Sequence, residues 1–149
     1  MKKFEFHLEK LLSYKGQVLD SELMNLAVLN TQLSDAQHKL LTFEMEQEQC
    51  RMDFESKMQE KTTPSTCLMY TFYTKHLKEQ ILITEKTIKN IADQVDMQIE
   101  LIKKLKLETK SLETLKTSRL DEYKREDTKA AEQQLEEFVS TARIIRKSI

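Results

Sequence analysis

Leucine recurs at every seventh residue in the first part of the chain, and this spacing restricts the fold more than any other feature. Because an α-helix turns once per 3.6 residues, residues seven apart fall on one narrow stripe. A second series follows three positions behind the first and widens the same stripe. A period of seven keeps such a stripe facing a partner only when two helices supercoil around each other. The pattern therefore predicts a coiled-coil seam, made by Leu12, Leu19, Leu26, Leu33 and Leu40 with Leu29, Ala36, Phe43 and Cys50.

The composition favours long helices around a narrow seam and no compact globular core. The chain has one Gly and one Pro, 33% charged residues and a net charge of -1. Few turn-forming residues leave room for few breaks, and mixed charges with a seven-residue period are typical of long helices. Lys15 and Glu22 interrupt the stripe, and we expect both side chains to reach solvent at the edge of the seam. The near-neutral charge argues against binding to nucleic acid, and no apolar run is long enough to predict a transmembrane segment.

One strong break divides the chain, at the run from Lys61 to Thr66. Pro64 suits the first position of a helix, and Thr62 or Thr63 before it can cap that helix. We therefore predict a single all-α domain, residues 1–149, with a first helix over about 3–61, a turn over about 62–65 and a second helix over about 65–149. The second helix carries its own stripe, which slips between Leu115 and Thr128 and then recovers. The members of that stripe before the slip are Leu77, Ile81, Ile88, Ile91, Val95, Ile102, Leu105 and Leu112.

The two stripes match when the chain folds back near Thr63. Leu33 then faces Ile91 or Val95, and Phe4 faces Tyr123. A parallel homodimer would not require this agreement, so the sequence favours an antiparallel two-helix coiled coil within one chain, a helical hairpin. The same register separates Cys50 from Cys67 along the axis by about 13 Å, which is too far for a disulfide.

The motifs of common enzyme and metal sites are missing from this sequence. A single glycine cannot form a dinucleotide-binding fingerprint or a phosphate-binding loop. There is no Cys-x-x-Cys and no His-Glu-x-x-His, and His7, His38 and His76 are far apart. A two-helix hairpin also lacks the concave pocket that catalysis needs. We therefore expect no enzymatic activity, no metal and no cofactor.

Two surfaces are predicted to extend beyond the seam. Near the turn, Met69, Phe72 and part of Tyr73 fall outside the stripe, where they either bind a partner or widen the packing of the tip. At the other end, the second helix is longer than the first by about 24 residues, or about 36 Å. This overhang, about residues 126–149, keeps an apolar stripe and carries Arg143, Arg146 and Lys147 with no acid in its last part. The overhang indicates a site for another protein, the alternative being a frayed helix.

Both ends of the chain resemble a known family. The run Phe4-x-Phe6-x-Leu8-Glu9-Lys10-Leu11-Leu12-x-x-x-Lys15 resembles the opening signature of the flagellar export protein family FliJ. The run Glu132-Gln133-x-Leu135-Glu136-Glu137-Phe138 is similar to the closing segment of that family, which often has Asp at the position of Glu136. Length, helicity and the mid-chain break also agree, so the resemblance covers the whole chain.

The resemblance implies an antiparallel coiled coil in the bacterial cytoplasm, similar to the γ stalk of rotary ATP synthases. Such a protein would insert its terminal end into the hexameric flagellar export ATPase and stimulate it. Its tip would contact the membrane-embedded export gate protein, giving a peripheral association with the inner membrane, and it would bind export chaperones. The implied ATPase-facing residues are Phe4, Phe6, Leu8, Leu11, Phe138, Arg143 and Arg146, and the implied gate-facing residues are Phe43, Cys50, Tyr73 and Leu77. Glu46, Gln80 and Thr84 stand where the family tends to be more apolar or aromatic.

Two alternatives remain open at the level of sequence. One is the related stalk protein of a virulence type III secretion system, which has the same fold. Neighbouring flagellar genes would distinguish a flagellar protein from this alternative. The other is a structural coiled-coil tether with no ATPase partner. Stimulation of an ATPase would distinguish both secretion proteins from such a tether.

Overall fold

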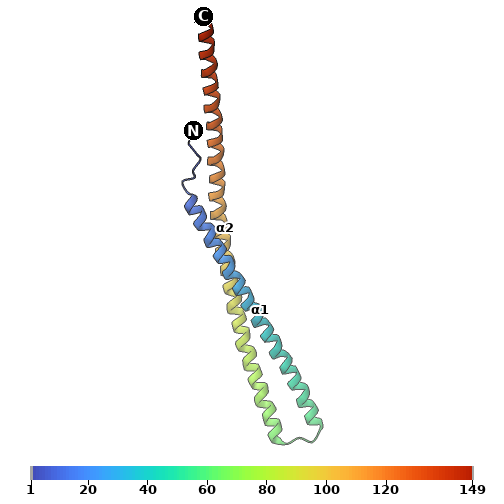
Figure 1. The fold of residues 1–149 in the computed structure, drawn as a ribbon. Coiled ribbons are helices and arrows are strands. Elements are labelled where there is room, and N and C mark those ends of the chain that lie inside the picture. Colours follow the sequence, from blue (N-terminus) through green and yellow to red (C-terminus); the bar gives the residue numbers. More distant parts are fainter. Residues whose placement is uncertain (1, 149) are drawn as a thin grey trace. The chain divides into compact units, whose positions relative to one another are not determined.

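The computed structural model describes residues 2–148 and contains two long helices, α1 (Glu9–Gln59) and α2 (Pro64–Ser148) (Figure 1). The helices pack against each other as a helical hairpin, and no strand occurs among the described residues, which confirms the predicted fold class. The contacts group into two units. The terminal unit comprises residues 2–20 and 103–148, and the tip unit comprises Ser21–Ile102.

Helix α1 begins later than the sequence predicted. Residues 2–8 are not helical, and the first turn of α1 starts at Glu9, instead of near residue 3. If the helix began near residue 3, Lys2 and Lys3 would lie at the positive end of the helix dipole, which is unfavourable for cations. The carboxylate of Glu9, in the observed first turn, is instead stabilised by that end of the dipole. The segment packs on α2 instead: the Phe4 ring lies 5.6 Å from the Tyr123 ring, and the Tyr123 hydroxyl donates to the Lys2 carbonyl at 2.6 Å. The pairing of Phe4 with Tyr123 confirms the predicted register.

The turn between the helices follows the predicted capping chemistry. Helix α1 ends at Gln59 and α2 begins at Pro64, each within two residues of the prediction. The Thr66 amide donates to the Thr63 hydroxyl at 3.3 Å, so Thr63 is the capping residue and Pro64 occupies the first helical position. The same amide also donates to the Thr63 carbonyl at 3.1 Å, so the first turn of α2 closes on Thr63.

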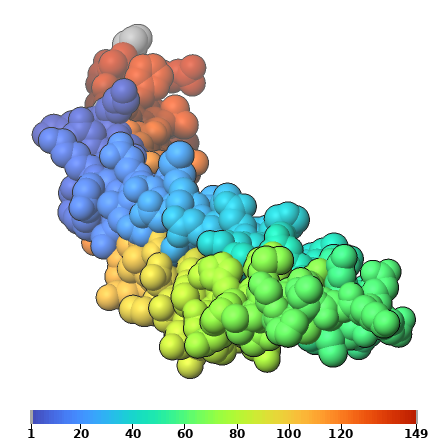
Figure 2. All heavy atoms as spheres, turned by 90° about the horizontal axis from the view of Figure 1, so that it is seen from below, coloured from blue at the N-terminus to red at the C-terminus, as the bar shows by residue number. Residues whose placement is uncertain are grey.

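The tip unit is held together by the predicted seam. In its α1 section, half-buried residues recur at alternating spacings of four and three, with exposed residues between them. Figure 2 shows α1 side chains (cyan to green) packed directly against those of α2 (yellow-green). Leu77 is 1% exposed, and the Phe54 and Tyr70 rings lie 5.6 Å apart. The half-buried or buried α1 positions are Glu22, Leu26, Leu29, Leu33, Ala36, Leu40, Phe43, Gln47, Cys50 and Phe54. Both cysteines are free, as the register predicted.

The terminal unit has a second short section of seam. Leu105 is buried on α2, and Phe6, from the non-helical segment, is 8% exposed. Thr109 is also buried, and its hydroxyl has no hydrogen-bond partner among the described residues. Few side chains are fully buried in either unit, and this confirms the predicted narrow seam in place of a globular core.

The two charged interruptions of the seam, Lys15 and Glu22, are half-buried at its edge, and each also makes a polar contact with the other helix. The Lys15 ammonium lies 2.7 Å from the Glu108 carboxylate, within the terminal unit. This hydrogen bond holds the pKa of Glu108 below its usual value. In the tip unit, the Gln98 amide donates to both the carbonyl and the carboxylate of Glu22. A shifted register would leave these half-buried groups unpaired, so the two polar contacts help to fix the alignment of the helices.

Gly16 offers a direct test of the helical seam. It lies inside α1, and a Cβ placed on it meets no atom within 4 Å. We expect Gly16→Ala to raise the free energy of unfolding by about 1 kcal/mol, because alanine loses less backbone entropy than glycine in a helix. Urea unfolding followed by circular dichroism measures the change. A lower stability would mean that α1 is not helical at this position.

Candidate partner-binding surfaces

The N-terminal members of the predicted ATPase-facing set are engaged with their own chain. Phe4 and Leu8 are half-buried and Phe6 is buried, so these side chains attach residues 2–8 to the terminal unit. Leu11, one of the first residues of α1, is 40% exposed. Only part of this group is therefore accessible to a partner without rearrangement.

The C-terminal members of that set are exposed. Every described residue from 131 to 148 is exposed, and Phe138 is 72% exposed. Leu135, Ile144 and Ile145 are also more than half exposed, which is unusual for large aliphatic side chains in one short stretch. Arg143 and Arg146 lie among them. We call residues 131–148 the terminal stripe.

Three of the four predicted gate-facing residues lie in the intramolecular seam. Leu77 is fully buried, Cys50 is 5% exposed with its sulfur 3.5 Å from the Thr74 hydroxyl, and Phe43 is half-buried. The Lys39 ammonium also covers the Phe43 ring at 5.8 Å from its centroid. Tyr73 is the accessible member, at 45% exposure. The pKa of the Tyr73 hydroxyl is raised mainly by desolvation and, second, by the nearby Glu46 carboxylate.

The tip also carries apolar side chains on its outer surface. Leu68, Met69 and Phe72 are 54%, 66% and 63% exposed, which confirms that Met69 and Phe72 lie outside the seam. Together with Tyr73 they form a patch on the first turns of α2, which we call the tip patch. No charged residue occurs between Thr62 and Thr74, so this patch favours an apolar contact.

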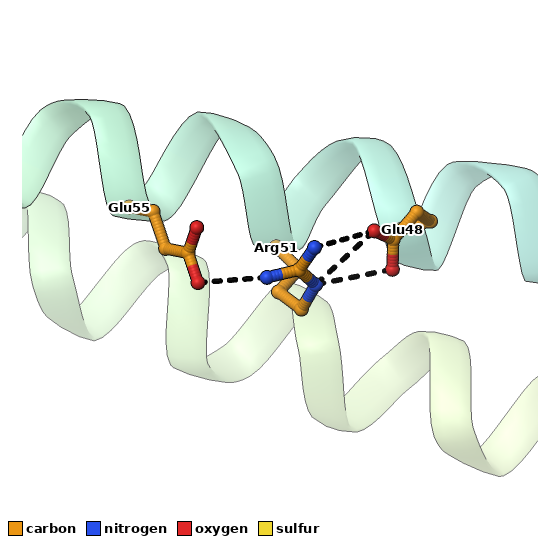
Figure 3. A network of polar contacts seen from close by, with 3 residues as sticks. All are labelled: Glu48, Arg51 and Glu55. Atoms are coloured by element: carbon orange, nitrogen blue, oxygen red, sulfur yellow. Dashed lines mark hydrogen bonds and ion pairs between the residues drawn. The ribbon is translucent and has the colours of Figure 1, made fainter.

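Sequence reasoning missed a groove between the two helices of the tip unit. It has a volume of about 630 Å³ and lies over the Phe54 and Tyr70 rings. Along α1 its rim is an ionic cluster in which Arg51 is held by Glu48 and Glu55, the latter at 2.7 Å (Figure 3). The hydrogen bond from Arg51 lowers the pKa of Glu48. The groove as a whole is lined by Gln47, Glu48, Arg51, Phe54, Tyr70, Thr71, Thr74, Lys75 and Lys78.

Comparison with known families decides what kind of chain this is. The family model described as the flagellar FliJ protein matches residues 4–148, nearly the whole chain. The chain belongs to the FliJ family. No curated protein and no solved structure matches it. FliJ proteins are non-catalytic components related to flagellar export, and the family implies partners in the flagellar export apparatus.

The structure adds two observations that bear on how a FliJ protein meets its partners. Neither helix contains, within residues 2–148, a stretch long and apolar enough to cross a membrane. The described residues also bring no three metal-ligating side chains of His, Cys, Asp or Glu together. The terminal stripe, the tip patch and the groove are the candidate surfaces for partner contact.

Proposed function

We propose that this protein binds the flagellar export ATPase through its terminal unit and stimulates the assembled ring. The observation that carries the proposal is the terminal stripe, whose large apolar side chains are covered by no described part of the chain. Burying exposed apolar area against a partner is favourable by about 25 cal/mol per Å², and aromatic residues are enriched among the strongest contacts. Family membership over residues 4–148 supports the choice of partner.

Stimulation would follow from a preference for one state of the ring. A helix that inserts into a ring contacts several subunits at once and binds the assembled, active arrangement more tightly than the separate subunits. The differential affinity then shifts the population toward that arrangement without any chemistry in the stalk itself. Arg143 and Arg146 would add electrostatic steering toward acidic positions on the ring.

The tip patch is the surface we assign to the export gate. Tyr73 is shared with the predicted gate-facing set, whereas Leu68, Met69 and Phe72 replace the seam residues Cys50 and Leu77 as contacts. This assignment needs no opening of the hairpin. The protein would then be an adaptor in the cytoplasm that is associated with the inner membrane through the export gate. The same protein would also bind export chaperones.

The test measures ATP hydrolysis by the purified export ATPase with increasing amounts of this protein. We expect Phe138→Asp to weaken ring binding about 30-fold or more, because loss of a central aromatic contact costs about 2 kcal/mol or more. The matched control is Met97→Asp, at a side chain that is 74% exposed in the tip unit, which should stimulate as the wild type does. Equal stimulation by both variants would assign ATPase binding to another surface, and no stimulation by the wild type would reject the proposal.

A further inference from the structure

On the α2 side, the groove of the tip unit is lined by Tyr70, Thr71, Thr74, Lys75 and Lys78. Thr71 and Thr74 are small, so the aromatic floor of Phe54 and Tyr70 stays open between the helices. On the α1 side, the Arg51 guanidinium is bound by Glu48 and Glu55 of the same helix (Figure 3). The result is an open recess with an aromatic floor between the two helices of the tip unit.

The α2 rim of the groove is positively charged and unneutralised. Lys75 and Lys78 are exposed, lie three residues apart on one helix, and make no ion pair with any of residues 2–148. Arg51 already has two carboxylate partners, so it adds little free charge to the rim. A matching occupant is a helix with apolar side chains for the recess and carboxylates about one turn apart for the two lysines.

One exposed stretch of this same chain has that chemistry. Within the terminal stripe, Leu135 and Phe138 are 64% and 72% exposed. Glu132 and Glu136 lie one turn apart beside them, and neither makes an ion pair in the described chain. Lys75 and Lys78 belong to the same continuous helix, α2, as residues 132–138, and two segments of one helix cannot contact each other, so the occupant of the groove has to come from another molecule.

We propose that the groove binds residues 132–138 of a second copy of this chain. Leu135 and Phe138 pack over Phe54 and Tyr70, and Glu132 and Glu136 approach Lys75 and Lys78. Apolar burial supplies most of the binding free energy, because exposed ion pairs contribute little, while the charges set alignment and salt dependence. A recess that accepts side chains fits a helix better than it fits a flat lipid surface.

Self-association of this kind would regulate the proposed ATPase contact. It covers Phe138, so a copy held in the groove of another cannot present that side chain to a ring. The contact joins two different surfaces, and it therefore gives either a reciprocal pair or a longer assembly. In both cases dilution or a tighter partner releases the terminal stripe.

The first experiment measures the average mass of the full chain by sedimentation across about 10–300 μM at low and high salt. We expect the mass to rise above the 17.6 kDa monomer with concentration, and less so at high salt. Lys75→Glu with Lys78→Glu, or Glu132→Lys with Glu136→Lys, should each weaken self-association at least tenfold, and a mixture of the two reversed variants should recover it. The matched control is Lys86→Glu with Lys89→Glu, on the same helix outside the groove, which should associate as the wild type does.

A second measurement works on the wild type and does not depend on how the variants fold. Carbodiimide joins an ammonium and a carboxyl group in ion-pair contact through an amide bond, and a mixture of ¹⁴N and ¹⁵N copies distinguishes links between molecules. We expect Lys75 or Lys78 to be joined to Glu132 or Glu136 of another copy. A wild type that stays at 17.6 kDa at low salt overturns the proposal, as does a mixture of reversed variants that stays monomeric. Loss of binding to anionic vesicles by Lys75→Glu with Lys78→Glu, in a monomeric chain, would assign the groove to lipid instead.

Discussion

Leu77→Asp is expected to cause the largest loss of stability of any single substitution in this chain. Leu77 is 1% exposed and lies in the seam of the tip unit, where few side chains are fully buried. Truncating a buried leucine costs about 2–5 kcal/mol, and burying an unpaired carboxylate adds several kcal/mol. A narrow seam has little other burial to offset this loss, so the tip unit should be largely unfolded at 37 °C.

Leu82→Asp is the matched control for this substitution. Leu82 is five residues further along α2 and is 58% exposed, so the same change of side chain should alter the free energy of unfolding by about 0.5 kcal/mol or less. Thermal melting followed by circular dichroism compares the two variants with the wild type. Equal melting temperatures for both variants would place Leu77 outside the seam and would contradict the helical pairing described above.

The seam could be predicted from the sequence because it depends on periodicity alone. The leucine series specified which face of α1 is buried, and the matching of the two stripes specified the register that places Phe4 against Tyr123. The capping by Thr63 was equally local, since it needs only Pro64 and a threonine before it.

What could not be predicted depends on contacts between residues far apart in the chain. Helix α1 starts at Glu9 because residues 2–8 pack on α2, an interaction that outweighs their helical pattern. Lys15 and Glu22 interrupt the stripe as single residues, and only the fold reveals Glu108 and Gln98 as their partners.

The candidate sites show the same division. A family resemblance transfers positions without regard to burial, and for that reason it selected Cys50 and Leu77, which the seam occupies. The groove was missed because its lining alternates between two helices and includes small threonines that carry no signal of their own. Arg51 and Lys78 flank the stripes of their helices, and attention to these flanking positions could have pointed to that side of the hairpin.

Deletion of residues 131–149 is expected to abolish stimulation of the export ATPase while leaving the melting temperature nearly unchanged. Every described side chain from 131 onward is exposed, so the deletion removes few contacts with the rest of the chain. The remaining part of α2 keeps its seam residues, including Ile102 and Leu105. Stability and function should therefore separate in this variant, which they do not in Leu77→Asp.

The deletion needs a charge-based companion, because removing a whole segment does not show which of its side chains bind. Arg143→Glu with Arg146→Glu should weaken ring binding more at low salt than at high salt, since exposed charges are screened within about 10 Å at 0.1 M ionic strength. The decisive comparison pairs melting temperature with stimulation of ATP hydrolysis. A large fall in melting temperature with stimulation intact would make residues 131–149 a structural part of the hairpin and would remove the terminal stripe from the proposed function.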